Sequence, residues 1–205
     1  MITQAKMRKI VRELAEIDKR FAPVIERSEL CDIGTRNPER SHFESLVSSV
    51  ISQQLATAAA RTIKDRFVLE CGKVTPKNVA AMEIEQLRGA GLSGAKAKTV
   101  QGLATAALER QVDFNKLHEM DDEEVYQSLT SLWGIGPWTV DMFMMWQLGR
   151  LDIWPTGDLG VRRGWEKVHK LKEEITPDAL GKKGDKFKPH RSIVAWYCWR
   201  AIDLD

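Results

Sequence analysis

The chain has 205 residues, of which 43% are hydrophobic and 29% charged, enough for one large domain or two small lobes that share a core. No run approaches the roughly 20 apolar residues that span a bilayer, and the charged N-terminal segment is unlike a secretory signal, so we expect no membrane partner. A cytoplasmic location is expected, or a nuclear one in a eukaryote. The net charge of +2 is too small to identify nucleic acid as a partner. Three widely separated cysteines predict neither a disulfide framework nor a metal knuckle, and no cofactor is expected.

Apolar residues recur every three or four positions near the start of the chain, which predicts an amphipathic helix. This stripe contains Met7, Ile10, Val11, Leu14 and Ile17. After it, we expect a turn near Phe21 to Pro23.

A second helix is predicted to begin at Ser41, because Ser41 and Glu44 have the spacing of a capping box. The apolar run after them predicts a well-buried helix that continues through the alanines at 56 and 58–60. Thr75–Pro76 and Thr176–Pro177 each have the pattern of an N-cap followed by a first-turn proline, so each predicts a further helix.

Two other segments contain glycines at informative places. Gly91 to Ala104, GLSGAKAKTVQGLA, is similar to a loose, glycine-centred helix junction. The stretch 181–189, GKKGDKFKP, is the best candidate for a mobile loop. Sustained alternation with a period of two is missing throughout, while helix caps and helical stripes recur, so the sequence predicts an all-α fold.

Gly134, Ile135, Gly136 and Pro137 interrupt the helical pattern within LWGIGPWTVDMF. Two glycines this close allow positive φ and leave backbone N–H groups uncovered by side chains. The next helix begins at Pro137 or Trp138, and its N-terminus adds unsatisfied donors and the positive end of a dipole. The segment therefore predicts a turn that can hold a phosphate.

Asp158 follows Thr156–Gly157 and precedes a new helical stretch, and two interpretations compete for it. In the first, its carboxylate caps that helix by accepting an N–H bond. In the second, the same geometry presents an ionised carboxylate to a sugar, where it stabilises positive charge on the ribose or positions a water as an N-glycosidic bond breaks. At about 4 Å and an effective dielectric of about 20, such a pair gains roughly 4 kcal/mol, on the order of a thousandfold in rate.

Ordinary glycosidases use a second carboxyl group to protonate the leaving atom, and Asp158 has no evident partner. Asp141 and Asp152 are secondary candidates, although surface roles suit both. The absence of a second acid favours a leaving group that departs unprotonated, such as a purine made cationic by alkylation.

All seven tryptophans lie between residues 133 and 199. A large aromatic core is one explanation. Trp133 and Trp138 flank the glycine turn, however, and Trp154 precedes Asp158 by four residues, so these three are also candidates for the walls of a pocket that stacks a base. Two basic clusters, one from Arg162 and one that ends at Arg191, indicate either a DNA-binding surface or solvated charge.

Four segments in this order resemble a known family: SVISQQLATAAARTI, LWGIGPWTVDMF, WPTGDLGVRRG and FKPHRSIVAWYCWR. From about Ser41 to Arg200 the chain resembles the helix-hairpin-helix superfamily of DNA glycosylases, and within it the compact 3-methyladenine DNA glycosylase II group. The resemblance implies a two-lobed helical protein that bends double-stranded DNA, flips a damaged nucleotide into an inter-lobe active-site cleft and hydrolyses its glycosidic bond. A single domain is expected, with 41–180 as its approximate central core and 1–40 packed with 181–205 as the other lobe.

The resemblance also assigns roles. Asp158 matches the catalytic acid, and Gly134, Ile135 and Gly136 match residues whose amides grip a phosphate, in some relatives with a monovalent cation at the carbonyls near Gly134. The segment that fills the gap left by the flipped base matches Gln53, Gln54, Leu55 and Ala56, with the plugging residue left open among the last three. Trp138 stands where bifunctional relatives have a lysine, so no lyase step is expected.

Two departures concern the substrate pocket. Met142 stands where the best-known bacterial relatives have a tyrosine, and Phe187 where they have a tryptophan. Weaker aromatic walls reduce selection for cationic bases by roughly 0.5 to 2 kcal/mol.

The sequence thus predicts a monomeric, monofunctional glycosylase for alkylated purines, with 3-methyladenine as the first candidate substrate and 7-methylguanine as the second. A glycosylase for deaminated or mismatched bases, a non-catalytic DNA-binding module and a helical scaffold without DNA remain as alternatives.

Overall fold

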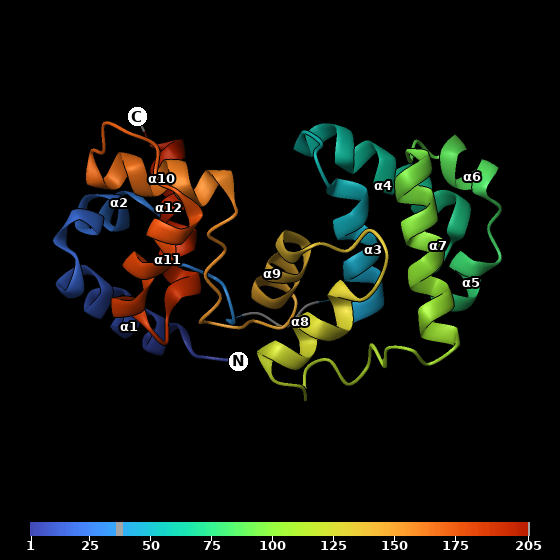
Figure 1. The fold of residues 1–205 in the computed structure, drawn as a ribbon, viewed down its shortest axis with the longest axis horizontal. Helices are drawn as coiled ribbons and strands as arrows, with labels where there is room; N and C mark the ends of the chain where they lie inside the picture. The colour runs from blue at the N-terminus through green and yellow to red at the C-terminus, as the bar shows by residue number, and fades with distance from the viewer. Residues whose placement is uncertain (36–38, 205) are drawn as a thin grey trace. The chain divides into compact units, whose positions relative to one another are not determined.

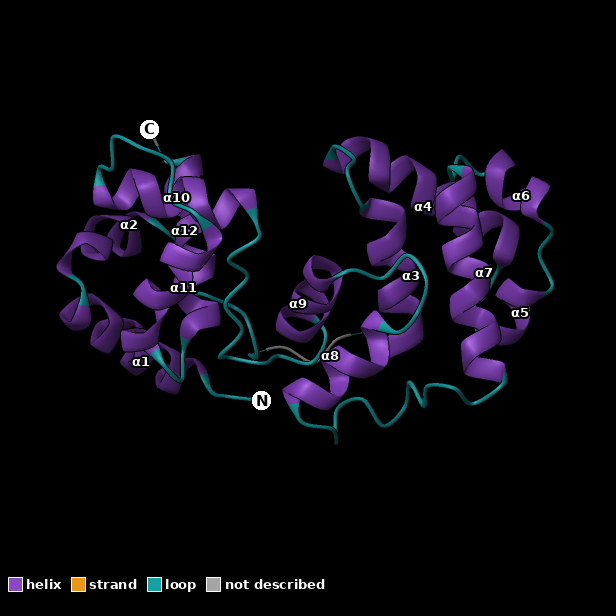
Figure 2. Cartoon of the chain, in the orientation of Figure 1, coloured by secondary structure: helices purple, strands orange, loops and turns teal. Residues whose placement is uncertain are grey.

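A computed structural model describes residues 1–35 and 39–204, and within them all regular structure is helical (Figures 1 and 2). The predicted all-α class is therefore confirmed for the described chain. None of the described helices combines the length and apolar character that a membrane span requires.

The described chain divides into two compact units. Unit 1 combines residues up to 35 with those from Met144 onward, and unit 2 comprises residues 39 to 143. The boundary differs from the predicted core of 41–180, because residues 144–180 pack with the terminal segments. Residues 164 and 198 illustrate this packing. A Cβ added to Gly164 would lie 1.8 Å from the Cys198 carbonyl oxygen, so the two backbones are in close contact.

Unit 1 contains seven helical segments and the last turn of an eighth. They are α1 (Gln4–Ile17), η1 (Lys19–Phe21), α2 (Ala22–Arg27), α10 (Leu159–His169), α11 (Pro177–Gly184), η2 (Asp185–Phe187) and α12 (Arg191–Asp203), with the end of α9 (Pro137–Trp146). Its core is aromatic: Trp165 packs against Phe21, Phe187 and Trp154 at centroid distances of 5.9 to 6.2 Å. This cluster confirms a core role for part of the tryptophan set.

Unit 2 is built around α7 (Gly94–Leu108). The other elements are α3 (His42–Ser52), α4 (Thr57–Cys71), α5 (Pro76–Ala80), α6 (Ile84–Gly89), α8 (Asp122–Thr130) and most of α9. Helices α3, α5 and α6 all contact α7, and Figure 1 shows α7 running beside α5 and α6. Small residues on α7, including Ala97 and Ala104, are fully buried and permit this close packing.

The predicted caps are confirmed. Ser41 Oγ accepts the Glu44 N–H at the start of α3, and the hydroxyls of Thr75 and Thr176 cap α5 and α11 in the same way, each ahead of its proline. Helix α9, which follows the glycine turn at 134–136, begins at Pro137, as expected.

Four local predictions are wrong. The helix from Ser41 does not continue through residues 56–60, because residues 53–56 form a turn in which Gln54 has a φ of 54°. The turn expected at Phe21 to Pro23 is helical. The stretch 181–189 is largely helical rather than a loop. Its Gly184 serves packing, because a Cβ there would lie 2.4 Å from the Trp154 ring. Ile17 also lies outside the buried stripe of α1.

Candidate active site

Asp158 is the N-cap of α10. Its Oδ1 accepts the Val161 N–H at 2.8 Å, so the capping interpretation of this residue is correct. The same oxygen also accepts the indole Nε1–H of Trp199 at 2.9 Å, from α12. Donors from two helices therefore fix the carboxylate at the positive end of the α10 dipole, a geometry that serves the catalytic interpretation equally well.

Trp199 is a site residue that sequence reasoning missed, and Trp146 is another. Their rings stack with centroids 6.1 Å apart and planes inclined by 22°. Trp199 is half-buried, whereas Trp146 is exposed. The two indoles and Asp158 thus form one group within unit 1, with a flat aromatic surface beside the carboxylate. No local sequence pattern indicated it, since Trp199 lies 41 residues from Asp158.

Gly160 and Cys198 complete the surroundings of this carboxylate. A Cβ on Gly160 would lie 2.8 Å from the Trp199 ring and 3.1 Å from the Asp158 carboxylate, so only glycine fits without a shift. Burial raises the pKa of the Cys198 thiol, and the negative charge of Asp158 raises it further. The thiol therefore stays protonated and offers no nucleophile.

Two predicted pocket residues of unit 1 pack with its aromatic cluster: Phe187 is buried in the core, and Trp154 is half-buried beside it. Phe187 is only 1% exposed and packs edge-to-face against Phe21 and Trp165. Trp154 donates its indole N–H to the Leu180 carbonyl at 2.9 Å and contacts Trp165. Sequence proximity to Asp158 was misleading for Trp154, because its side chain turns toward α11.

The predicted DNA-binding arginines of unit 1 are engaged internally. Arg191 forms a bidentate ion pair with Asp152, with contacts of 2.8 and 2.9 Å, and also donates to the Asp152 carbonyl. This pair gives Asp152 a structural role and removes both residues from the candidate site. Arg162 is half-buried, and its Nη1 lies 3.5 Å from the Ile175 carbonyl.

One of the two glycines of the unit 2 turn, Gly134, adopts the positive φ that the sequence allows. Gly134 has a φ of +81°, and a Cβ there would meet the Thr99 hydroxyl at 2.1 Å. A Cβ on Gly136 would meet nothing within 4 Å. Ile135 differs from expectation: its N–H donates to the Leu132 carbonyl at 3.1 Å and its side chain is buried, so it anchors the turn. The Ile135 N–H is therefore already engaged within the turn, and a phosphate contact by the two glycines stays a prediction. The Gly134 carbonyl has only a long contact, 3.5 Å from Gln53 Nε2, and carbonyl oxygens of this kind suit a monovalent cation.

The turn at residues 53–56 lies close to the glycine turn at 134–136. Gln53 Nε2 donates to Thr139 Oγ1 at 2.9 Å, so Gln53 links the turn to α9 and does not point outward as a DNA contact. Gln54 and Leu55 are exposed, with 37% of Leu55 accessible, and Ala56 occupies the N-cap of α4. Leu55 is thus an apolar side chain presented to solvent beside the glycine turn.

The remaining predicted residues of unit 2 lie on or near α9. Trp133 is 55% exposed, with the Lys98 ammonium 4.5 Å from its ring centroid, and Trp138 is also exposed. Met142 and Asp141 are half-buried. The charge of Asp141 contributes to a raised pKa of Tyr126, of which burial is the larger cause.

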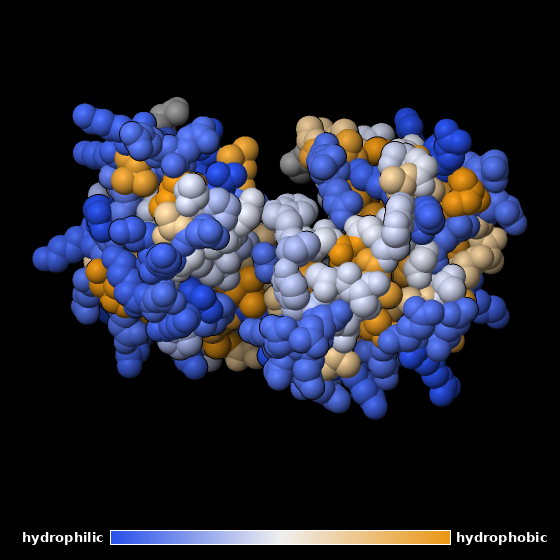
Figure 3. Space-filling model, viewed as in Figure 1, coloured by the Kyte–Doolittle hydropathy of each residue, from blue (hydrophilic) through white to orange (hydrophobic). Residues whose placement is uncertain are grey.

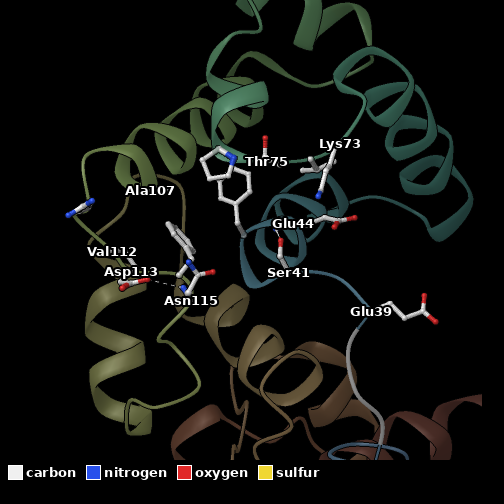
Figure 4. Close-up of a pocket in the computed structure, with 14 residues that line it drawn as sticks. Glu39, Ser41, Glu44, Lys73, Thr75, Ala107, Val112, Asp113 and Asn115 are labelled. Carbon is white, nitrogen blue, oxygen red and sulfur yellow. Dashed lines mark hydrogen bonds between the residues drawn. The ribbon is translucent and has the colours of Figure 1, made fainter.

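A separate groove of about 670 Å³ opens on unit 2 and contains none of the predicted site residues (Figure 4). Carboxylates of Glu39, Glu44 and Asp113 line it together with Lys73 and Arg110, over an apolar floor that includes Phe43. Mixed charge of this kind is typical of the protein surface, and Figure 3 shows polar residues over much of the visible face of both units. The groove has no part in the candidate active site.

Comparison with protein families gives one match over most of the chain. The model described as "HhH-GPD superfamily base excision DNA repair protein" matches residues 47–190. Among individual proteins, the chain is 29% identical to "Alkylbase DNA glycosidase-like protein mag2" of Schizosaccharomyces pombe, with 94% of this chain and 92% of that protein covered. It is 32% identical to "DNA-3-methyladenine glycosylase 1" of the same organism, with 84% and 79% covered.

Two solved structures are similar over nearly the whole chain. The Bacillus halodurans DNA-3-methyladenine glycosidase has a TM-score of 0.80 at 30% identity, with 94% of this chain and 88% of that one covered. The S. pombe 3-methyladenine DNA glycosylase Mag1, in complex with abasic DNA, has a TM-score of 0.83 at 28% identity, with 97% of each chain covered.

Proposed function

Because the chain belongs to the HhH-GPD superfamily of base excision DNA repair proteins, we propose that it is a DNA glycosylase that hydrolyses the N-glycosidic bond of alkylated purines, with 3-methyladenine as its principal substrate. The names of the similar proteins support this substrate class. The observation that carries the proposal is the Asp158 carboxylate, held at the start of α10 by donors from two helices and flanked by stacked indoles.

Asp158 acts on the sugar. As the bond to an alkylated purine breaks, positive charge develops on the deoxyribose, and a fixed anion beside C1′ stabilises it without reorganisation. The bonds from Val161 and Trp199 hold the carboxylate in place for this role. An alkylated purine already carries positive charge and leaves as a neutral base, so one carboxylate is sufficient.

The residues of unit 2 bind and distort the DNA. Gly134 and Gly136 donate backbone N–H groups to a phosphate, which positions the strand without reading its sequence. A monovalent cation held through the Gly134 carbonyl would add positive charge at that phosphate. Leu55 is the plug: it is the exposed apolar side chain of the 53–56 turn, and apolar wedges of this type fill the stack when a base is extruded.

The test is a substitution of the carboxylate. Asp158→Asn retains a side chain that caps α10 but removes the charge. With methylated duplex DNA under single-turnover conditions, release of 3-methyladenine should fall by at least about a thousandfold, while the affinity for duplex with an abasic site changes little. The released bases are measured by chromatography.

Asp121→Asn is the matched control, because Asp121 caps α8 of unit 2 with the same bond to a backbone N–H. It should leave base release unchanged. Full turnover by Asp158→Asn would remove the carboxylate from the mechanism. Intact DNA after incubation of the unsubstituted protein with every alkylated substrate would reject the glycosylase itself.

A further inference from the structure

The carbonyl groups at the C-terminal end of α3 have an unusual set of donors. A helix end leaves its last carbonyls without partners inside the helix. Here the Gln53 N–H reaches the carbonyls of Ser49 and Val50, and the Leu55 N–H reaches that of Ser52. The carbonyls of Ile51 and Gln53 both accept from the Lys96 ammonium, at 2.8 Å each. The backbone satisfies the first three, and a side chain from another helix satisfies the other two.

Lys96 is placed against the dipole of its own helix. It lies in the first turn of α7, where a positive charge is disfavoured, yet its ammonium reaches the C-terminus of α3, where one is favoured. Partial burial lowers the pKa of Lys96, a further cost. The two short bonds to the carbonyls of Ile51 and Gln53 therefore offset the unfavourable position of this charge in α7.

The turn that receives these bonds is strained. Gln54 has a φ of 54°, a left-handed conformation that costs a residue other than glycine about 1 kcal/mol. Such a conformation persists where the surroundings fix it, and Lys96 fixes the carbonyl directly before Gln54. Leu55 is the next residue, so the direction in which the proposed plug points depends on this bond.

Helix α7 also contacts the glycine turn at Gly134. Thr99, one turn beyond Lys96, packs against the Cα of Gly134, and Gln53 bridges the 53–56 turn to Thr139. The first two turns of α7 therefore contact both segments of unit 2 that are proposed to touch DNA.

We propose that Lys96 is a positioning residue that presets the 53–56 turn for insertion into DNA, at a fixed spacing from the glycine hairpin. This inference rests on the proposed function. Without the ammonium, the turn must be ordered during each insertion, so base release slows while the hairpin still binds phosphate.

The experiment compares Lys96→Met with Lys98→Met. Both remove one positive charge from α7, but Lys98 is exposed and its ammonium lies over the Trp133 ring, 4.5 Å from the centroid. In the DNA-free protein, exchange of the hydrogen-bonded amides of Gln53 and Leu55 should accelerate about tenfold or more in Lys96→Met and stay unchanged in Lys98→Met. Buried amides of α7 serve as the internal reference that separates local loosening from global destabilisation.

Kinetics supply the second measurement. Single-turnover base release should fall about tenfold in Lys96→Met, with the slope of log affinity against log salt unchanged, and Lys96→Arg should recover much of the rate because it restores the donors. A salt slope lower by about one would identify Lys96 as a direct phosphate contact and overturn the proposal. Unchanged exchange at Gln53 and Leu55 would overturn it as well.

The hydrogen exchange measurement needs neither DNA nor activity. If the unsubstituted protein releases no base, the proposed function fails, whereas the exchange of the turn still decides whether Lys96 holds it.

Discussion

At the scale of single residues, the Asp158 carboxylate depends on an indole contributed by a distant part of the chain. A hydrogen bond to a charged group contributes about 1.5 to 3 kcal/mol when it is well formed. The Trp199 bond therefore has enough free energy to influence both the orientation of the carboxylate and its reactivity.

Trp199→Phe isolates this bond. Phenylalanine keeps an aromatic ring against Trp146 but cannot donate to Asp158. We expect single-turnover base release to fall about tenfold, with affinity for abasic-site DNA changed by less than about threefold. Trp196→Phe is the control on the same helix, since that ring packs edge-to-face on Tyr197. A full rate in Trp199→Phe would show that the cap bond from Val161 alone positions the carboxylate.

Sequence reasoning found Asp158 and its cap, because both depend on neighbours within three residues. It could not find Trp199, because that contact is made by α12. The same limit explains Phe187, which matched a pocket position in the resemblance yet is buried in the core of unit 1. Side-chain direction after a turn is set by tertiary packing, and one sequence does not encode it locally.

At the scale of helices, glycine has two different uses in this chain. Gly164 of α10 permits direct contact with the backbone of α12, whereas Gly181 of α11 has nothing within 4 Å of its absent Cβ. Composition alone does not separate a packing glycine from a flexible one, which is why 181–189 was predicted to be a loop.

This difference predicts opposite effects of the same substitution. Gly164→Ala should destabilise the protein by about 3 kcal/mol, because the added methyl displaces α12. Gly181→Ala should be neutral or stabilise it by up to about 1 kcal/mol, because alanine favours helix. Urea denaturation of both variants measures the difference. Equal stabilities would mean that α10 and α12 separate at little cost.

Helix starts were predicted well because side-chain caps are local, and the break at 53–56 was missed for the converse reason. Gln53 to Ala56 contains neither glycine nor proline, and the donors that stabilise the turn come from α7. A helix that ends through a tertiary contact leaves no signal in its own sequence.

At the scale of the whole molecule, one buried carboxylate joins three separate segments of unit 1. Asp18 accepts three bonds from Arg20, two of them from the guanidinium and one from the backbone N–H, as well as one from Lys186 at 2.9 Å and one from His169 at 3.1 Å. Burial alone would raise the pKa of Asp18, but these donors outweigh it and lower the pKa below its usual value of 3.8. The junction of α1 and η1 is thereby fastened to α10 and η2.

Asp18→Asn should lower the free energy of unfolding by about 2 to 4 kcal/mol at pH 7, because it leaves a buried site with unmatched donors. A lowered folded pKa stabilises the protein above pH 3.8, and this contribution is lost as pH falls further. The difference between variant and unsubstituted protein should therefore narrow below pH 4, as the Asp18 carboxylate becomes protonated. Asp185→Asn, at an exposed pair with Lys188, should cost less than about 1 kcal/mol. Thermal melts across this range provide the measurement, and a pH-independent difference would contradict the assignment.

The stacked indoles of Trp146 and Trp199 also have an optical consequence. Aromatic rings 6.1 Å apart couple their electronic transitions, and one of them donates to the carboxylate that we assign to catalysis. A nucleobase that stacks on Trp146 perturbs this coupling. Near-ultraviolet circular dichroism can then follow the arrival of a lesion without any attached dye.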